Sequence, residues 1–326
     1  MSKPFVDVAA GLIQRPDGSL LLAQRPAGKP WAGWWELPGG KIERGETAHE
    51  ALARELKEEL GINVTTATPW VTYTHDYPKS VVRLAFWRVS AWTGEPTGIE
   101  GQELAWVDPQ HTITIGPLLP ATQPPLRWLR LPDQYLITSI GPYPNLPGFL
   151  AKLTAALERG VRLVQFREPS SEMTEPQCRD AFEQVLQCCR RHQALCLVNS
   201  AHPKMWWGQA DGVHFRASDA QARYVAMSGP GPARRAHPGL IGVSCHNAAD
   251  LHAARRLEAD FAVLGHVLPT PSHPHEAAMG WAQFAELANG AGLPVFAIGG
   301  QSADTLTEAR QQGAHGIAGI RALIAA

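Results

Sequence analysis

The chain has 326 residues, a length typical of a two-domain protein. Its 29 Lys and Arg residues nearly balance its 30 Asp and Glu residues, and a formal net charge of −1 argues against a nucleic-acid surface as the main interface. With 44% hydrophobic residues the chain can build ordinary cores, but no apolar run approaches the ~20 residues of a membrane-spanning helix.

The start of the chain lacks the apolar core of a signal peptide. The five cysteines show no two-residue spacing typical of zinc or redox pairs, and an odd number is a poor disulfide framework. We therefore expect a cytoplasmic protein that binds neither a membrane nor nucleic acid directly.

Two β-strands are predicted near the N-terminus. Residues 5–14 and 19–24 are apolar runs that flank the turn Pro16-Asp17-Gly18. Arg25 follows the second strand, where it is either a surface arginine or a ligand of substrate phosphate. Three tryptophans come next, and their density is typical of packing, although an indole can also stack on a base: Trp31, Trp34 and Trp35.

A helix is predicted over the stretch that ends near residue 61. Thr47 with Glu50 three residues later forms a capping box, which satisfies two backbone N–H groups at a helix start. Gly61 can adopt the left-handed conformation that ends a helix. Leucines recur every four residues, as on a buried helix face: Leu52, Leu56 and Leu60.

Three acidic residues, Glu55, Glu58 and Glu59, share one face of this helix. They stand at i, i+3 and i+4, where like charges cost roughly a few tenths of a kcal/mol per pair. One interpretation is a solvated acidic face, but an ordinary surface helix would interleave lysines at these positions. The other is a set of hard oxygen ligands for Mg²⁺ or Mn²⁺, which would remove the repulsion. We favour the metal site.

Residues 40–62 resemble the Nudix box and match it at every specified position. This resemblance implies a hydrolase that cleaves a nucleoside diphosphate linked to another moiety. It implies that Glu55, Glu58 and Glu59 bind metal, with a carbonyl near Gly39 and Gly40 as a further ligand. It also implies that Arg54 and Glu46 form an internal pair that orients the loop and the helix.

The resemblance extends to the 8-oxo-dGTP diphosphatase branch, MutT, over residues 37–43 and 94–102. It implies that Glu100 contributes to metal binding and catalysis, that Arg25 contacts phosphate and that Lys41 binds substrate. Thr122 stands where that branch has an asparagine that reads the oxidised purine. A threonine has one hydroxyl where the amide offered a donor and an acceptor together, which leaves the choice of base open.

Further strands are predicted at residues 70–75 and 81–90, and short strands with one long helix suggest an α/β/α sandwich. The expected reaction is metal-assisted substitution at phosphorus, in which the metal ions neutralise charge and activate water. Glu55, Glu59 or Glu100 would accept the proton from that water. Six prolines between residues 109 and 134 predict a structured but non-regular connection, with a domain boundary near residue 132.

The second domain, residues 133–326, is predicted to be a (β/α)₈ barrel. Eight apolar runs recur, mostly about 20 to 35 residues apart: residues 135–140, 161–166, 195–199, 212–215, 240–244, 261–265, 295–298 and 316–320. Polar residues and glycines stand at their ends, either as barrel-rim groups or as a site, and we favour a site: Gln165, Arg167, Asn199, His214, Ser244, His246, His266, Gly299 and Gly300. The two glycines read as a phosphate cradle.

This half resembles the thiamine phosphate synthase and TenI superfamily, through the segments at residues 135–138, 164–168, 210–214, 242–244 and 297–300. It departs from the synthase at three positions, where Pro169 and His273 replace lysines and Ser200 replaces a metal-binding aspartate; Asp219 remains at the other metal position. Residues 265–267 are similar to TenI, and this implies that His266 serves thiazole tautomerisation.

We therefore expect a Mg²⁺-dependent hydrolase of 8-oxo-dGTP or other oxidised nucleoside triphosphates, which yields the monophosphate and pyrophosphate and cleanses the nucleotide pool. It would be fused to a TenI-like barrel that lacks synthase chemistry. One alternative is a Nudix enzyme acting on thiamine-pathway pyrophosphates, with a barrel that binds a phosphorylated thiazole or pyrimidine. Another is a barrel that only senses such a ligand.

Overall fold

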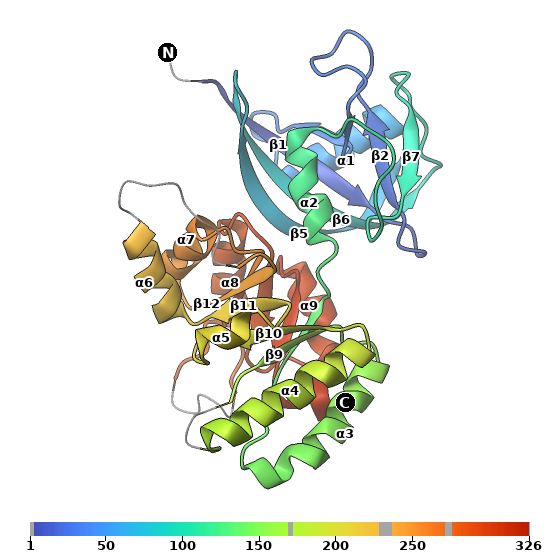
Figure 1. The fold of residues 1–326 in the computed structure, drawn as a ribbon. Coiled ribbons are helices and arrows are strands. Elements are labelled where there is room, and N and C mark those ends of the chain that lie inside the picture. The colour runs from blue at the N-terminus through green and yellow to red at the C-terminus, as the bar shows by residue number, and fades with distance from the viewer. Residues whose placement is uncertain (1–2, 169–171, 228–236, 271–275, 326) are drawn as a thin grey trace. The chain divides into compact units, whose positions relative to one another are not determined.

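The computed structural model describes residues 3–168, 172–227, 237–270 and 276–325 (Figure 1). The chain divides into two compact units, Met1–Leu131 and Pro132–Ala326. In the described ranges no helix has both the length and the apolar character needed to cross a membrane. Two residues important to the sequence comparison, Pro169 and His273, lie outside the described residues.

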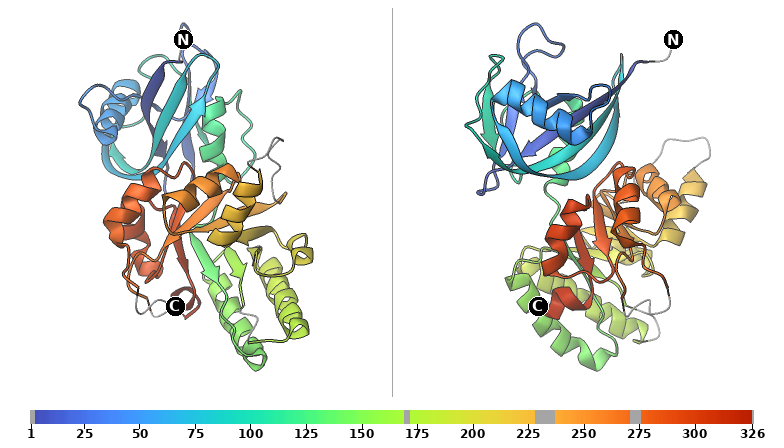
Figure 2. Two further views of the ribbon diagram at one scale, coloured as in Figure 1. Left: turned by 90° about the vertical axis from the view of Figure 1, so that its left-hand side faces the viewer. Right: turned by 180° about the vertical axis from the view of Figure 1, so that it is seen from behind.

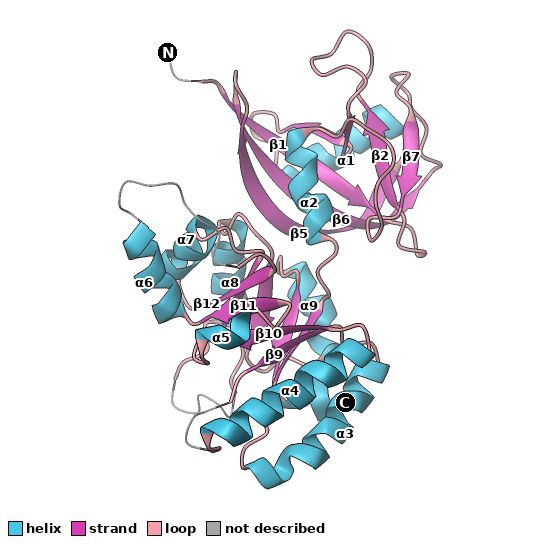
Figure 3. Cartoon of the chain, viewed as in Figure 1, coloured by secondary structure: helices cyan, strands magenta, loops and turns pink. Residues whose placement is uncertain are grey.

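The N-terminal unit contains two β-sheets (Figure 3). The four-stranded sheet has the order β4-β1-β6-β5, in which β1 runs parallel to β6 and the other pairs are antiparallel. The three-stranded sheet has the order β3-β2-β7 and is antiparallel throughout. The strands are β1 Phe5–Ile13, β2 Leu20–Gln24, β3 Trp35–Glu36, β4 Gly39–Lys41, β5 Asn63–Asp76, β6 Val81–Thr93 and β7 Leu104–Val107.

Two helices cover opposite faces of these strands, α1 Ala48–Leu60 and α2 Gln123–Trp128. Alternate residues of β1 show this directly, because Ala9 belongs to the core cluster beneath α1 and Ala10 to the cluster that includes α2. A strand with apolar side chains on both faces needs a covering layer on each side. The unit is therefore the α/β/α sandwich that the sequence predicts.

The local signals for α1 are confirmed. Thr47 caps the helix, its side chain accepts the Glu50 N–H, and the Glu50 side chain returns to the Thr47 N–H. Gly61 ends the helix with φ +71°. The predicted leucine stripe is fully buried: Leu52, Leu56 and Leu60.

The prediction for residues 109–134 is wrong in one respect, because the segment contains regular structure. A 3₁₀ turn, η1 Pro120–Thr122, leads into α2, whose first turn accommodates the proline pair that suggested a non-regular chain. Leu126 and Trp128 are buried in the N-terminal core. Prolines that would interrupt a helix interior are tolerated in the first turn, where no intrahelical N–H is needed.

Strand β5 is longer than predicted, since it begins at Asn63 rather than at residue 70. Pro69 lies within it, and the pairing with β6 shifts register between Pro69 and Thr72. Because β5 is at the edge of its sheet, Pro69 is compatible with the strand, as proline is at edges and bulges.

The C-terminal unit is a closed barrel of eight parallel strands (Figure 2). All eight predicted runs form strands: β8 Gln134–Ile137, β9 Leu163–Phe166, β10 Leu195–Asn199, β11 Gly212–Phe215, β12 Leu240–Cys245, β13 Phe261–Gly265, β14 Val295–Ile298 and β15 Gly316–Gly319. The barrel closes where β15 pairs with β8. The fold class predicted from the sequence is confirmed.

A helix follows each strand of the barrel (Figure 1). These are α3 Leu146–Glu158, α4 Glu175–Arg191, α5 Lys204–Trp207, α6 Ala217–Met227, α7 Ala248–Arg256, α8 Gly280–Asn289, α9 Leu306–Gln311 and α10 Arg321–Ala325; the 3₁₀ turns η2 Tyr143–Asn145 and η3 Ala303–Thr305 precede α3 and α9. In such a barrel the residues at the carboxyl ends of the strands share one face, where active sites are built.

The role of α2 in the N-terminal core gives a stability prediction. Trp128 is 4% exposed and its ring lies 5.6 Å from that of Tyr73, so Trp128→Ala should destabilise this unit by about 3–5 kcal/mol. The neighbouring Arg127 is exposed, and Arg127→Ala is the matched control. The stability of both variants is measured by the urea dependence of hydrogen exchange in peptides from β1 and β6. Equal protection of these peptides in the two variants would contradict the assignment of α2 to this core.

Candidate functional site

The N-terminal unit contains a cavity of about 950 Å³ beside Gly39 and Gly40 of strand β4, which precedes α1. Most of the predicted site residues line it: Arg25, Gly39, Gly40, Lys41, Glu55, Glu59, Glu100 and Thr122. Arg54 and Glu58 lie outside this lining. Residues that are far apart in the sequence thus meet at one cavity, and the polar ones carry both signs of charge.

Gly39 and Gly40 pack directly against the acidic face of α1. A Cβ on Gly40 would lie 2.2 Å from the carboxyl carbon of Glu55, and one on Gly39 would lie 2.2 Å from the carbonyl oxygen of Ala9. Gly39 also has φ +143°, which L side chains rarely adopt. Gly39 therefore requires glycine, whereas a side chain at Gly40 would displace the Glu55 carboxylate, against which this backbone packs.

Arg54 connects the loop before α1 to the helix itself. Its guanidinium donates from Nε and Nη2 to the Glu46 carboxylate at 2.9 and 3.0 Å, and from Nη2 to the carbonyl of Lys41 at 3.0 Å. It also donates from Nη1 to Glu55 at 2.9 Å and to Glu58 at 3.3 Å. Arg54 is therefore a positioning residue that fixes the loop and two carboxylates together.

Glu59 is the acidic residue whose environment is most perturbed. The pKa of Glu59 is raised to about 7, mainly by burial and also by the nearby charges of Glu36, Glu55 and Glu100, although the hydrogen bond from the Gly39 N–H lowers it. That N–H donates to Glu59 Oε2 at 3.3 Å. A bound cation would relieve this mutual repulsion.

The donor set suits a divalent metal, since carboxylate and carbonyl oxygens are the ligands that Mg²⁺ and Mn²⁺ prefer. Within the described residues, no three His, Cys, Asp or Glu side chains are already gathered around one point. Two of the carboxylates are engaged by cations, Glu55 by Arg54 and Glu100 by Lys29. A solvated acidic face describes only Glu58, whose side chain is 61% exposed.

Sequence reasoning missed four charged residues of this cavity, Lys29, Glu43, Lys79 and Glu36. Glu36 accepts from Arg25 Nη1 through both carboxylate oxygens, at 2.6 and 2.7 Å, and burial raises the pKa of Glu36. Its position one residue before the matched stretch at 37–43 was the available signal. Lys29 forms an ion pair with Glu100, and no local pattern marks that long-range contact.

Aromatic rings complete the cavity wall. Trp31 and Tyr77 line it, with their ring centroids 6.0 Å apart. Trp31 is 42% exposed and has φ +62°, an unusual conformation for a bulky residue, and it makes a T-shaped contact with Trp34, with ring centroids 4.8 Å apart. Of the three tryptophans, Trp31 is thus the one that offers an indole to the cavity.

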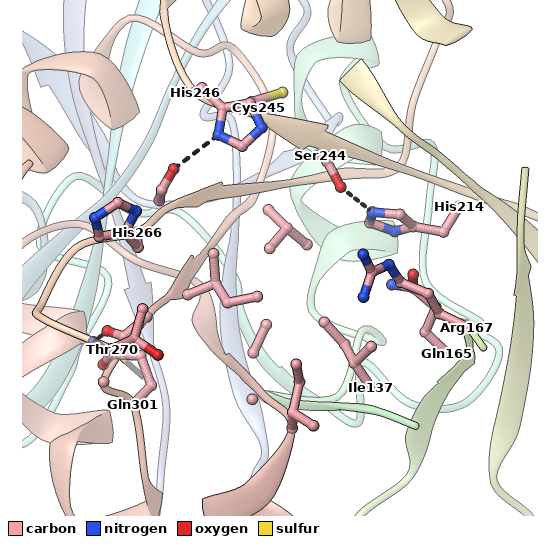
Figure 4. Close-up of a pocket in the computed structure, with 18 of the residues that line it drawn as sticks. Ile137, Gln165, Arg167, His214, Ser244, Cys245, His246, His266, Thr270 and Gln301 are labelled. Atoms are coloured by element: carbon pink, nitrogen blue, oxygen red, sulfur yellow. Dashed lines mark hydrogen bonds between the residues drawn. The ribbon is translucent and has the colours of Figure 1, made fainter. Parts of the chain in front are cut away.

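The barrel has its own cavity, of about 780 Å³, at the carboxyl ends of its strands (Figure 4). Every barrel residue predicted for the site lines it: Gln165, Arg167, Asn199, Ser244, His266, Gly299 and Gly300, together with His214 and His246. The sequence also missed Arg216, which lines the same cavity.

A chain of hydrogen bonds crosses the floor of this cavity, and its direction is fixed at one end. The backbone N–H of Ala201 donates to Asn199 Oδ1 at 3.0 Å, so the Asn199 amide nitrogen must donate onward, to Gln165 Oε1 at 2.8 Å. Gln165 then donates to the Tyr135 hydroxyl at 3.0 Å, and that hydroxyl shares a hydrogen bond with His214 Nδ1 at 3.2 Å.

The last link of this chain joins His214 Nε2 to the Ser244 hydroxyl at 2.9 Å (Figure 4). Burial, with a smaller effect from Arg167, lowers the pKa of His214 to about 3, so the ring is neutral and carries one N–H. With the proton on Nε2 the ring donates to Ser244, and with the proton on Nδ1 it donates to Tyr135 and accepts from Ser244.

At the rim, Asp219 is engaged by an arginine. Arg216 donates to both Asp219 oxygens, at 2.8 and 3.0 Å, and the Ser200 hydroxyl donates to Asp219 as well. A single carboxylate that is already paired in this way does not fit a Mg²⁺ site. The charge of the Asp219 carboxylate is thus already balanced by a protein cation.

Two histidines face the cavity from neighbouring strands (Figure 4). His246 Nδ1 donates to the carbonyl of Gly265 at 3.0 Å, which assigns the proton to Nδ1 and leaves Nε2 as an acceptor. His266 Nε2 donates to the carbonyl of Glu276 at 3.3 Å. Both rings are held by backbone carbonyls, an arrangement suited to proton transfer.

Comparison with known proteins identifies both halves. The family description "NUDIX domain" matches residues 4–129, and "Thiamine monophosphate synthase" matches residues 134–323, more than half of the chain. The chain belongs to both families: it is a Nudix hydrolase joined to a thiamine phosphate synthase/TenI domain. The family and fold predictions from the sequence are confirmed.

Curated relatives agree with this assignment. An 8-oxo-dGTP diphosphatase of Haemophilus influenzae is 42% identical over 121 residues, which is 37% of this chain and 88% of that protein. A CTP pyrophosphohydrolase of Escherichia coli is 40% identical over 37% of this chain and 87% of its own length. A thiamine-phosphate synthase of Thiobacillus denitrificans is 32% identical over 55% of this chain and 82% of its own length. The Nudix half is thus similar to enzymes of two substrate preferences.

Buried histidines make the TenI domain acid-sensitive. Burial lowers the pKa of His202 to about 4, and of His214 to about 3, from an ordinary value near 6.5. Below pH ~6.5 the unfolded chain binds protons that the folded barrel cannot, so stability should fall as the pH drops from about 6.5 toward 4.

The measurement is the urea midpoint of barrel peptides, followed by hydrogen exchange, at pH 7 and pH 5. His202→Gln should shrink the loss between these pH values, whereas His252→Gln, at an exposed histidine, should not. An undiminished loss in the His202 variant would show that its burial does not cause the acid sensitivity.

Proposed function

We propose that the Nudix half hydrolyses oxidised nucleoside triphosphates, 8-oxo-dGTP above all, to the monophosphate and pyrophosphate. The observation that carries this proposal is that Glu55, Glu59 and Glu100 line one cavity together with Arg25, beside strand β4. The domain that contains this cavity is similar to 8-oxo-dGTP diphosphatases. Acidic and basic groups together at one wall suit a polyphosphate carried by a divalent metal.

Glu55, Glu59 and Glu100, with a carbonyl of Gly39 or Gly40, are the residues that would hold Mg²⁺ or Mn²⁺, and Glu58 would join them from the rim. When bound, the metal would neutralise phosphate charge and lower the pKa of the attacking water. Each of the three cavity carboxylates is a candidate to accept a proton from that water.

The remaining charged residues of the cavity bind and orient. Arg54 donates to Glu55 and Glu58, and it also contacts Glu46 and the Lys41 carbonyl. It therefore keeps the two carboxylates of α1 fixed relative to strand β4. The cationic side chains of Arg25 and Lys41 are the candidates for contact with substrate phosphates. In this arrangement Arg54 positions carboxylates, whereas Arg25 and Lys41 meet the substrate.

The base end of the cavity is lined by Thr122, Tyr77 and Trp31. Thr122 is only 4% exposed, so a base that reaches it is shielded from water, and its hydroxyl can donate or accept one hydrogen bond. Trp31 offers a face for stacking. These residues accommodate a purine or a pyrimidine, and for that reason the test must include CTP.

The test is a comparison of kcat/KM for 8-oxo-dGTP, dGTP, CTP and thiamine-pathway diphosphates with Mg²⁺. We expect 8-oxo-dGTP to be the best substrate and pyrophosphate to be its product. Glu59→Gln should reduce turnover by ~10²-fold or more, because water activation and charge neutralisation both depend on the metal. Glu95→Gln, at a side chain 82% exposed, is the matched control.

Other outcomes of this comparison decide between alternatives. A higher kcat/KM for CTP would replace the proposed substrate while keeping the reaction. A preference for a thiamine-pathway diphosphate would support the rival in which both halves serve one pathway. Near-normal turnover of Glu59→Gln at saturating Mg²⁺ would show that the metal assignment is wrong.

For the barrel we propose binding or tautomerisation of a phosphorylated thiazole or pyrimidine, without synthesis of thiamine phosphate. The supporting observation is the Arg216–Asp219 pair, since the synthase reaction needs metal and cations aimed at departing pyrophosphate. Ser200 offers no second carboxylate. Gly299, Gly300 and Arg167 still line the cavity for a phosphate, and His266 lies beside them.

To test this, both synthase substrates and Mg²⁺ are supplied to the full chain carrying Glu59→Gln, which silences the Nudix half and so protects the diphosphate substrate. We expect no thiamine phosphate. Conversion between thiazole tautomers that disappears in His266→Ala would support a catalytic barrel, and binding without conversion would support a sensor. Thiamine phosphate formed at a rate typical of enzymes would refute the proposal.

A further inference from the structure

Lys29 forms an ion pair with a residue of the proposed metal site. Its Nζ donates to Glu100 Oε2, and both side chains line the Nudix cavity. The two side chains are 44% and 41% exposed. Exposed pairs of this kind contribute little stability, so separating them costs little. A carboxylate oxygen that holds an ammonium group is also not fully available to a metal ion.

The cations in and beside the cavity differ in how firmly they are held. Arg54, just outside the lining, makes five hydrogen bonds, to Glu46, Glu55, Glu58 and a backbone carbonyl. Arg25 donates from Nη1 to both oxygens of Glu36 and from Nε to the Pro30 carbonyl at 2.7 Å. Lys29, in contrast, is paired with Glu100 through one flexible stem, so it can change partner without disturbing a network.

The backbone of Lys29 is nevertheless fixed. The segment between β2 and β3 closes on itself, because the Gly33 N–H donates to the Arg25 carbonyl at 2.9 Å and the Arg25 side chain holds Pro30. Gly28, with φ +87°, makes the turn that presents the next residue to the cavity. The lysine stem therefore starts from a fixed point, and only its end needs to move.

We propose that Lys29 holds Glu100 in the metal-free enzyme and transfers to the substrate's phosphates when a divalent metal takes Glu100. Lys29 thus competes with the metal but assists the nucleotide. This inference rests on the proposed function of the same cavity. It assigns Lys29 a role as a positioning residue for Glu100 and as a phosphate-binding residue in the complex.

The two roles predict effects of opposite sign. Removing the ammonium group frees Glu100, so a metal ion should bind the nucleotide-free enzyme more tightly. The same change removes a positive charge near the phosphates, so KM for the nucleotide should rise. If Lys29 merely stabilised the loop, its replacement would weaken both metal binding and nucleotide binding. If it were an irrelevant surface charge, its replacement would change neither.

The experiment uses the full chain and Mn²⁺ as the probe. Mn²⁺ binding without nucleotide is followed by the electron paramagnetic resonance signal of the free ion at constant ionic strength. For Lys29→Met we expect the Mn²⁺ Kd to fall about three- to tenfold, the size of one moderately screened charge contact. KM for 8-oxo-dGTP, measured at saturating Mn²⁺, should rise by a similar factor.

Two variants serve as controls. Lys29→Arg keeps the charge and should leave the Mn²⁺ Kd near that of the wild type. Lys3→Met removes a lysine with similar exposure, 41%, from an ion pair with Asp76 in the same unit, and it should change neither quantity. Circular dichroism melting curves establish that each variant is folded.

The outcomes separate this inference from the function on which it rests. If the wild type binds Mn²⁺ and hydrolyses nucleotides but Lys29→Met binds Mn²⁺ equally or more weakly, the inference is wrong and the function stands. An unchanged KM would likewise refute the transfer to phosphate. If the wild type neither binds Mn²⁺ nor hydrolyses nucleotides, both the proposed function and this inference are wrong.

Discussion

Repulsion among carboxylates is the constraint on which the Nudix unit depends. Glu36, Glu55, Glu59 and Glu100 all border one cavity, and such a cluster would disperse without compensation. The fold supplies a separate partner for each: Arg25 for Glu36, Arg54 for Glu55, Lys29 for Glu100 and the Gly39 N–H for Glu59. These contacts hold strand β4, the loop after β2 and helix α1 in fixed relative positions. The cavity is thus charged and yet stable before any metal arrives.

The barrel manages buried polarity without charge. Its floor is a chain of neutral groups, from Asn199 to Ser244, in which each donor meets an acceptor. Burial keeps His214 neutral, since a protonated ring in the barrel interior would lose its hydration. The charged groups stand at the rim, where Arg216 and Asp219 neutralise each other. The two halves therefore offer their ligands different surroundings, one strongly ionic and one mainly hydrogen-bonding.

The sequence predicts what depends on local pattern. The cap at Thr47, the leucine stripe of α1 and the eight apolar runs of the barrel each express a periodicity or a turn signal, and all are confirmed. Misleading local signals account for the errors: Pro69 concealed the first half of β5, and the prolines before Leu126 concealed α2. The roles of Lys29 and Arg216 could not be predicted, because each depends on a partner that only the folded chain brings near.

The backbone amide of Ala201 has an effect far from its own position. It can only donate a hydrogen bond, so the Asn199 and Gln165 amides each present their nitrogen to the next group along the chain. At the other end, the neutral His214 ring can hold its proton on either nitrogen, and the Ser244 hydroxyl can therefore meet a guest as a donor or as an acceptor. A molecule that enters the barrel thus finds two amides whose orientation is fixed and a hydroxyl that adapts to it. The main chain after β10 fixes one side of the cavity, while the position of a single proton adjusts the other.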